Sequence, residues 1–329
     1  MSDGGHERPL VEPEVERAEA IAGARAGGNV ETLERAASLW GDAWRELRKR
    51  WIFWIAAGLI SLFTLMAIVP QVFVAPSPAT HDPRDCGLRA EDGTFQDRLR
   101  PSSEHWFGTD LQGCDYYARV IYGARVSIVI GIGVTALAGL IGLTLGGIAG
   151  FYGGWFDQLI SRFVDVLFAI PFLVAAILFL NVIATAGNRN IGHVLLVLGV
   201  FGWPTLSRLF RASVIQAKAE DYVEAARAVG ASNRRILVRH IFPNAIAPAI
   251  VYATIAIGGV IAVEATLSFL GVGLTLPAIS WGLMINTAQT RITTDPHLLL
   301  FPGIFLSLTV LGFLLLGDAV RDALDPRLR

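Results

Sequence analysis

Six long apolar stretches constrain this chain more than any other feature of its sequence. They cover about residues 51–74, 126–149, 163–184, 191–210, 245–270 and 298–316. A helix needs roughly 20 predominantly apolar residues to cross a bilayer, because inside lipid every backbone amide must be satisfied within its own segment. The chain is 53% hydrophobic and 17% charged, whereas about a quarter of the residues of a soluble domain are charged. The sequence therefore predicts an all-α integral membrane protein with six transmembrane helices.

The positions of arginine and lysine predict how these helices are oriented. Basic residues gather at 45–50, between residues 208 and 239, and at 321–329. Positively charged segments beside a membrane span stay in the cytoplasm. We therefore expect both termini in the cytoplasm, with the segment 75–125, a turn near Asn188 and the segment 277–296 outside. No basic face lies apart from these membrane-proximal regions, which argues against nucleic-acid binding.

The remaining segments complete the predicted organisation. Residues 1–32 are polar, without the apolar stretch of a signal peptide, and predict a disordered cytoplasmic tail. Residues 33–50 carry apolar side chains at helical spacing with tryptophans on one stripe, which predicts an amphipathic interfacial helix, a plain solvated helix being the alternative. Residues 75–125 form the extracytoplasmic loop, 126–319 the transmembrane core with a cytoplasmic segment at 216–243, and 320–329 a cytoplasmic tail.

Both cysteines of the chain, Cys86 and Cys114, lie in the predicted outer loop. An oxidising exterior permits a disulfide there. Such a bond would stabilise the loop by roughly 3 to 4 kcal/mol on a loop-entropy estimate. Two separate thiols are the alternative, since a sequence gives no distance between them. No metal-ligand spacing is present, so we expect no metal site.

The segment 216–243 carries consistent signals for two short helices. Asp221 and Glu224 have the spacing of a capping box, and Gly230 supplies a left-handed residue to end the first helix. Ser232 can cap the second helix, and Pro243 is expected to stop it. The small side chains of the first helix allow close approach, and the second adds Ile236, Leu237, Ile241 and several basic residues. This pattern suits docking of another protein. A membrane-surface helix is the alternative, and spans on both sides leave no room for DNA.

This segment also resembles the EAA loop of bacterial binding-protein-dependent ABC importers. The resemblance rests on Glu224-Ala225-Ala226, on Gly230 and on the closing Ile241-Phe242-Pro243. In that family the loop sits in a groove of the ATP-hydrolysing subunit. The resemblance therefore implies an ATPase-coupling role for Glu224, Ala225, Ala226, Gly230, Arg234, Arg235, Arg239, His240, Ile241, Phe242 and Pro243.

Other segments extend the likeness from about residue 51 to the C-terminus. Residues 105–110, 119–125, 150–154, 267–273 and 317–326 are similar to the C-type permease of dipeptide and oligopeptide importers. One departure is Cys114, which stands where that family usually has arginine. The resemblance implies the type I ABC importer permease fold in a bacterial inner membrane. It also implies three kinds of partner: a homologous permease, two ATPase subunits that bind ATP and magnesium, and an extracytoplasmic solute-binding protein. Peptide is the expected solute, although similar importers carry nickel, glutathione or oligosaccharides.

Several residues inside the spans are candidates for packing or for the solute path. Gly139, Gly142, Gly146 and Gly150 form a small face on one helix, which favours close helix contact in lipid. Glu264 is costly inside a membrane, so it either lines the path or bonds a neighbour. Asn181 and Asn286 either line the outer mouth or bond backbone. Pro171 and Pro204 are expected to bend their helices.

Catalytic chemistry is not expected in this chain. Its two lysines, Lys49 and Lys218, do not follow a glycine, so no phosphate-binding P-loop can be present and the ATPase must be another polypeptide. No protease or hydrolase motif and no cofactor motif occurs. The rival interpretations are an ion-coupled secondary transporter, which predicts internal repeats and several buried acids, and a membrane scaffold or receptor, which needs no docking loop.

Overall fold

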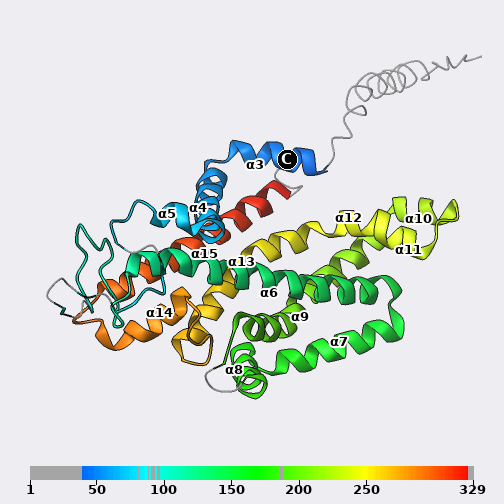
Figure 1. Cartoon of the computed structure of the whole chain (residues 1–329). Coiled ribbons are helices and arrows are strands. Elements are labelled where there is room, and N and C mark those ends of the chain that lie inside the picture. Colours follow the sequence, from blue (N-terminus) through cyan, green and yellow to red (C-terminus); the bar gives the residue numbers. More distant parts are fainter. Residues whose placement is uncertain are drawn as a thin grey trace, which may run out of the picture. The chain divides into compact units, whose positions relative to one another are not determined.

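The computed structural model describes residues 39–79, 82–87, 89, 93–94, 97–184 and 188–324, and these residues form helices and loops with no strand (Figure 1). The all-α class is therefore confirmed. Helix α3 (Leu39–Lys49) is the described part of the predicted interfacial helix. The predicted tail 1–32, residues 33–38 and the last five residues of the chain lie outside the described residues. The other helices belong to a single unit, Leu47–Arg329.

In the described part of the chain, five helices are long and apolar enough to cross a membrane. They are α4 (Trp51–Ile68), α6 (Tyr116–Tyr152), α9 (Ile191–Lys218), α13 (Ala247–Phe269) and α15 (His297–Leu324). Helix α9 continues through Pro204. A short helix, α5 (Pro70–Val74), follows α4. A sixth membrane segment is the bent pair described next, so the predicted count of six holds if that pair is one span.

The third predicted span, 163–184, is a broken segment that starts earlier than expected. Helix α7 (Gly154–Ala169) and helix α8 (Phe172–Ile183) meet at an angle of 87°. Pro171 lies at the break, and Ile170 before it has extended dihedrals, φ −98° and ψ 123°. A proline disfavours the helical conformation in the residue before it and has no N–H to continue the hydrogen-bond ladder. The bend expected at Pro171 is therefore present, and it ends one helix and begins another.

Helix α6 begins before the predicted boundary at residue 126. Asp115 caps it, accepting a hydrogen bond from the Ala118 N–H at 2.9 Å. Its first turns contain Arg119 and Arg125, which interrupted the apolar stretch in the sequence. Arg125 donates to the last carbonyls of α4, from Nε to Ala67 at 2.8 Å and from Nη2 to Ile68 at 3.1 Å. The charged side chain therefore satisfies a helix end, and the helix extends past the hydrophobic segment.

Helices α6 and α9 form the most extensive helix pair (Figure 1). A Cβ atom on Gly146 would lie 2.4 Å from the Ser207 carbonyl oxygen, and one on Gly150 would lie 2.8 Å from the Arg211 carbonyl oxygen. The contact at Gly142 is also with α9 backbone, at 3.0 Å. The glycine face of α6 is therefore a packing surface at which two backbones meet without an intervening side chain.

A second packed region surrounds helix α14 (Trp281–Ala288), which follows α13. Trp281 is fully buried among α4, α6 and α15, and its Nε1–H donates to the Val120 carbonyl of α6 at 2.9 Å. The Tyr116 hydroxyl donates to the Leu298 carbonyl of α15. Two buried polar side chains thus fix α14 and α15 against α6.

Candidate functional site

The segment between α9 and α13 folds as four short helical elements. They are α10 (Asp221–Ala228), α11 (Asn233–Arg235), the π-helix η1 (Ile236–Ile241) and α12 (Phe242–Ala245). Figure 1 shows them at one end of the long helices α9 and α13. We call this segment the EAA loop.

Gly230 makes the turn between the first two helices. It has a left-handed φ of 79°, as the sequence predicts. The Ala231 N–H donates to the Ala226 carbonyl at 3.0 Å, and the Gly230 N–H donates to the Arg227 carbonyl at 2.9 Å. These two bonds define a Schellman motif, which satisfies the last carbonyls of α10. Ser232 then caps α11 by accepting from the Arg235 N–H.

Two predicted helix boundaries are wrong. Asp221 is the first residue of α10, and Glu220 occupies the cap position without a side-chain hydrogen bond. Asp221 still stabilises the start of the helix, because its negative carboxylate interacts favourably with the partial positive charge at a helix N-terminus. Pro243 does not stop the second helix, since α12 continues to Ala245. Proline is tolerated in the first turn of a helix, where its missing N–H would have no partner.

One face of the EAA loop is buried against the chain's own membrane helices. We call it the inner face. Its buried residues are Val223, Ala226, Ile236, Ile241 and Ala245, packed with Phe210 and Val214 of α9 and Phe151 of α6. Ala226, Ile236 and Ile241 were expected on the docking surface, and that expectation is wrong. The π-helix explains part of the error, because its i to i+5 bonding widens the turn and Ile236 and Ile241, five positions apart, both face inward.

The opposite face, which we call the outer face, is exposed. It carries the predicted residues Glu224, Ala225, Arg234, Arg235, Arg239, Phe242 and Pro243, with His240 half-buried beside them. Val229 is 85% exposed and Val238 61% exposed. Val229 is one of the small side chains of the first helix that the sequence predicted to allow close approach. Val238 was not predicted as a site residue.

Polar contacts hold the ends of the neighbouring helices near this loop. Asp157 of α7 accepts two hydrogen bonds from Arg211 of α9, at 2.5 and 2.6 Å. Lys218 Nζ donates to the Phe151 carbonyl of α6 at 2.6 Å. Asp165 of α7 accepts from Arg208 of α9 and also forms an ion pair at 3.9 Å with Arg162, one turn before it on α7. These bonds tie α6, α7 and α9 together at the end where the EAA loop packs.

Tyr222 lies on α10 beside the outer face. Burial raises the pKa of its hydroxyl, the charge of Glu220 acts in the same direction, and a hydrogen bond with Asn244 opposes both. The hydroxyl therefore stays protonated at neutral pH and acts as a neutral hydrogen-bonding group.

A cavity of about 400 Å³ lies between the membrane helices. Residues at the bend between α7 and α8 form one wall, and the other walls come from α6, α9 and α13. Thr135, Thr205 and Tyr252 contribute its hydroxyl groups, and most other lining residues are apolar. No charged side chain among the described residues lines it.

The three predicted path residues lie outside this cavity. Glu264 is fully buried, and its Oε1 accepts from Ser268 at 2.8 Å and from Ser280, the cap of α14, at 3.0 Å. Asn181 donates to the Ile177 carbonyl at 2.8 Å, and Asn286 donates to the Phe269 carbonyl at 2.6 Å. Each makes the neighbour or backbone bond that was the alternative to lining, so a place on a solute path stays a prediction for them.

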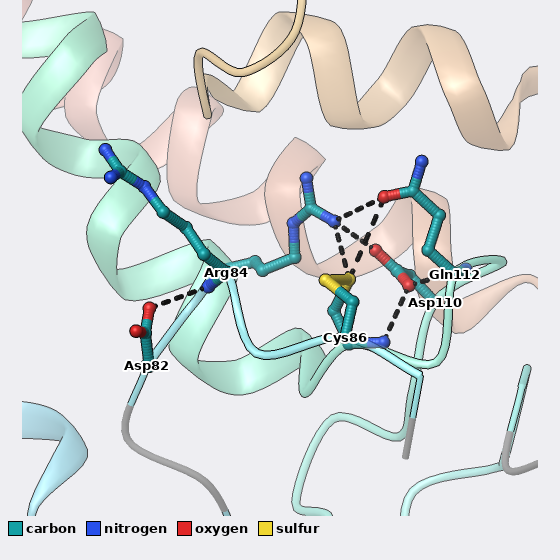
Figure 2. The surroundings of a disulfide bond; sticks show 7 residues. Asp82, Arg84, Cys86, Asp110 and Gln112 are labelled. Carbon is teal, nitrogen blue, oxygen red and sulfur yellow. Dashed lines mark hydrogen bonds and ion pairs between the residues drawn. A yellow bond between two sulfur atoms is a disulfide. The ribbon is translucent and has the colours of Figure 1, made fainter.

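The outer segment before α6 is held by a disulfide between Cys86 and Cys114 (Figure 2). Arg119 of α6 lies against it, with Nη1 3.0 Å from Cys114 Sγ and 2.6 Å from Asp110 Oδ2. Asp110 also accepts from the Cys114 and Gln112 N–H groups at 2.9 and 2.8 Å. A buried contact of 3.0 Å between His105 and Asp115 fixes the same turn. Among the described residues, no group of His, Cys, Asp and Glu side chains is arranged to hold a metal ion.

Long apolar helices, a bend at proline and a surface loop fixed to the bundle are the features of a multi-pass membrane protein. Residues 142–329 match the family described as binding-protein-dependent transport system inner membrane component, and residues 38–97 match the N-terminal transmembrane domain of oligopeptide transport permease C. The chain belongs to this family of binding-protein-dependent transport permeases.

Individual relatives cover most of the chain. The dipeptide transport system permease protein DppC of Alkalihalophilus pseudofirmus is 38% identical over 89% of this chain and 92% of its own length. The glutathione transport system permease protein GsiD of Escherichia coli is 39% identical over 88% and 91%. The oligopeptide transport system permease protein OppC of Bacillus subtilis is 36% identical over 94% and 96%. The sequence-based recognition of the family is confirmed.

A solved structure supports the fold. A chain of the MetNI methionine ABC transporter in an inward-facing conformation matches with a TM-score of 0.51 and 18% identity, covering 62% of this chain and 96% of its own. The ABC transporter permease fold expected from the sequence is therefore confirmed.

Proposed function

We propose that this chain is the membrane-spanning permease subunit of an ATP-driven importer for dipeptides or oligopeptides. It would pair with a homologous permease to form the path. Two ATPase subunits would bind ATP and magnesium, and an extracytoplasmic protein would deliver the solute. The chain itself would catalyse no reaction. The basic flanks support a location of its termini and of the EAA loop on the cytoplasmic side of a bacterial inner membrane.

The observation that carries this proposal is the two-sided EAA loop. Its outer face exposes Val229 and Val238 together with three arginines, Arg234, Arg235 and Arg239, which form no ion pair with any described residue. Apolar side chains rimmed by arginine are typical of a protein interface. Its inner face packs on α6 and α9 through fully buried Ile236 and Ile241. A force on the outer face would therefore move these two helices.

The solute class rests on the relatives. Two of them are named for dipeptide and oligopeptide transport and one for glutathione transport. Glutathione is a second candidate solute because the relative named for it is as similar as the others. All these solutes are small peptides that carry a free carboxylate.

The test is copurification of the tagged chain from its native membrane in mild detergent. We expect a second permease and ATPase subunits to be recovered with the wild-type chain. Val229→Asp should reduce ATPase recovery by at least fivefold, because it places a charge in the centre of the proposed interface.

Ile292→Asp is the matched control. Ile292 is 56% exposed on the segment after α14, so the same change there should leave recovery unaltered. Equal ATPase recovery with wild type and Val229→Asp would contradict docking at the outer face. Recovery of this chain alone, with transport driven by an ion gradient, would favour a secondary transporter.

A further inference from the structure

A cavity of about 860 Å³ lies among three segments that the sequence places outside the membrane core. They are the segment before Cys86, the start of α9 and the segment before α14. The first turns of α6 complete its wall. Its volume is in the range of roughly 300 to 1,000 Å³ that is typical of small-molecule sites.

The charged lining of this cavity is mostly positive. Arg84, Arg125 and Arg189 line it together with a single acid, Asp82. No carboxylate among the described residues forms an ion pair with any of the three arginines. Asp82 accepts from the backbone N–H of Arg84 at 2.9 Å. The described part of the cavity therefore carries two more positive than negative charges.

Arg189 is the most constrained of the three. It is 8% exposed, and its Nε–H has no hydrogen-bond partner among the described residues. Its Nη2 donates to Asn181 Oδ1 at 2.6 Å and its Nη1 to the Gly271 carbonyl at 3.3 Å. Burial of a guanidinium without a counter-ion is unfavourable. A bound anion would therefore stabilise Arg189.

The surrounding backbone adds to the same polarity. Asn190 and Gly192, at the start of α9, line the cavity. Asn190 caps this helix by accepting from the His193 N–H at 3.2 Å. The N-terminus of a long helix carries partial positive charge. The disulfide at Cys86, two positions after Arg84, ties this segment to Cys114, which directly precedes the cap of α6.

We propose that this cavity binds the carboxylate of a peptide solute on its way into the membrane domain. Guanidinium groups match the planar geometry of a carboxylate and can bind it through two parallel hydrogen bonds. The inference rests on the proposed function. It adds a site in this chain that selects for a free carboxylate, through Arg84 and Arg189.

The test is saturation-transfer NMR with the assembled complex in phosphatidylcholine nanodiscs, with dialanine and dialanine amide as probes. This method detects weak binding and does not depend on transport. We expect a dialanine signal at least threefold stronger than that of the amide. Arg84→Gln should abolish the difference, and Arg84→Lys should restore part of it. Arg84 is exposed and its side chain makes no hydrogen bond to any residue that the structure describes, so the variant is expected to fold.

Arg291→Gln is the matched control, because Arg291 is exposed near the same end of the protein and lies outside the cavity. It should leave both signals unchanged. Equal signals from the acid and the amide in the wild type would overturn the proposal. Loss of the dialanine signal when one third of the lipid is phosphatidylglycerol would also overturn it, by assigning the cavity to a lipid headgroup.

A transport measurement separates this proposal from the proposed function. Arg84→Glu should lower dialanine uptake at least fivefold, while the ATPase subunits still copurify. Unchanged uptake would refute the proposed carboxylate site without contradicting the proposed importer function. A wild-type complex without ATPase subunits would refute the importer, and the NMR comparison would still report on the cavity.

Discussion

Val229 and Ile241 show how single side chains divide the EAA loop between two tasks. Val229 is 85% exposed, whereas Ile241 is fully buried against α9. Burying an aliphatic side chain stabilises a fold by about 1.5 to 3 kcal/mol, so Ile241 contributes to this chain's own stability. In the proposed importer, Val229 makes its contacts only when a partner is bound.

Glu224 tests the charged part of the outer face. It is exposed on α10, one helical turn before the C-terminal end where Ala228 lies. We expect Glu224→Lys to reduce ATP-driven uptake about tenfold, equivalent to about 1.4 kcal/mol, because it reverses a charge at the proposed interface. Membrane insertion should be unchanged. Uptake by the variant at the wild-type rate would count against docking of the ATPase at the outer face of the EAA loop.

Gly230 tests the backbone of the same loop. A Cβ atom there would meet nothing within 4 Å, so only the positive φ opposes substitution. A left-handed conformation costs a β-branched residue about 1 to 2 kcal/mol. Gly230→Val should therefore weaken ATPase recovery in copurification, whereas Gly230→Asn, which tolerates this conformation, should behave almost as wild type. Normal assembly of the valine variant would show that the turn is not required.

At the scale of elements, the sequence predicted the helices better than their faces. Apolar length was enough to find α4, α9, α13 and α15. The proline predicted a bend at Pro171, but the sequence did not show that the bend is an 87° break between two helices, since a proline can bend a helix or end it. The sequence also misassigned Ala226, Ile236 and Ile241. The apolar side chains of a short amphipathic segment can face a partner protein or can pack against the chain's own helices, and the two cases have the same pattern. Only the packing against Phe210 and Val214 decides this.

The contact between α6 and α9 can be tested with one added methyl group. In Gly146→Ala the Cβ would lie 2.4 Å from the Ser207 carbonyl oxygen, so the helices must separate. Overpacking of this kind costs about 1 to 3 kcal/mol. We expect a lower thermal unfolding midpoint in detergent. Gly259→Ala in α13, where a Cβ meets nothing within 4 Å, is the control. Equal midpoints for the two variants would refute close packing at Gly146.

The outer segment depends on the disulfide in a measurable way. Cys86 and Cys114 are 28 positions apart, and closing a loop of this length stabilises it by roughly 3 to 4 kcal/mol. In Cys86→Ser/Cys114→Ser, we expect faster hydrogen exchange at the Gly87 amide, which donates to the Gln112 carbonyl. Exchange at buried Trp281 should not change. Identical exchange at Gly87 with and without the bond would contradict this role.

At the scale of the whole molecule, the membrane helices join three sites that lie apart in the sequence. The EAA loop packs on α6 and α9, the 400 Å³ cavity is bounded by the same two helices, and the arginine-lined cavity lies at their other ends. Two helices therefore contact every candidate site. In the proposed importer, movement at the outer face of the loop would reach both cavities through α6 and α9.

The most direct test of this account is uptake of labelled dialanine by proteoliposomes that contain the assembled complex, its binding protein and trapped ATP. We predict accumulation that requires ATP hydrolysis, persists without an ion gradient and is lost in Val229→Asp but not in Ile292→Asp. Accumulation driven by an ion gradient in the absence of ATP would contradict the account.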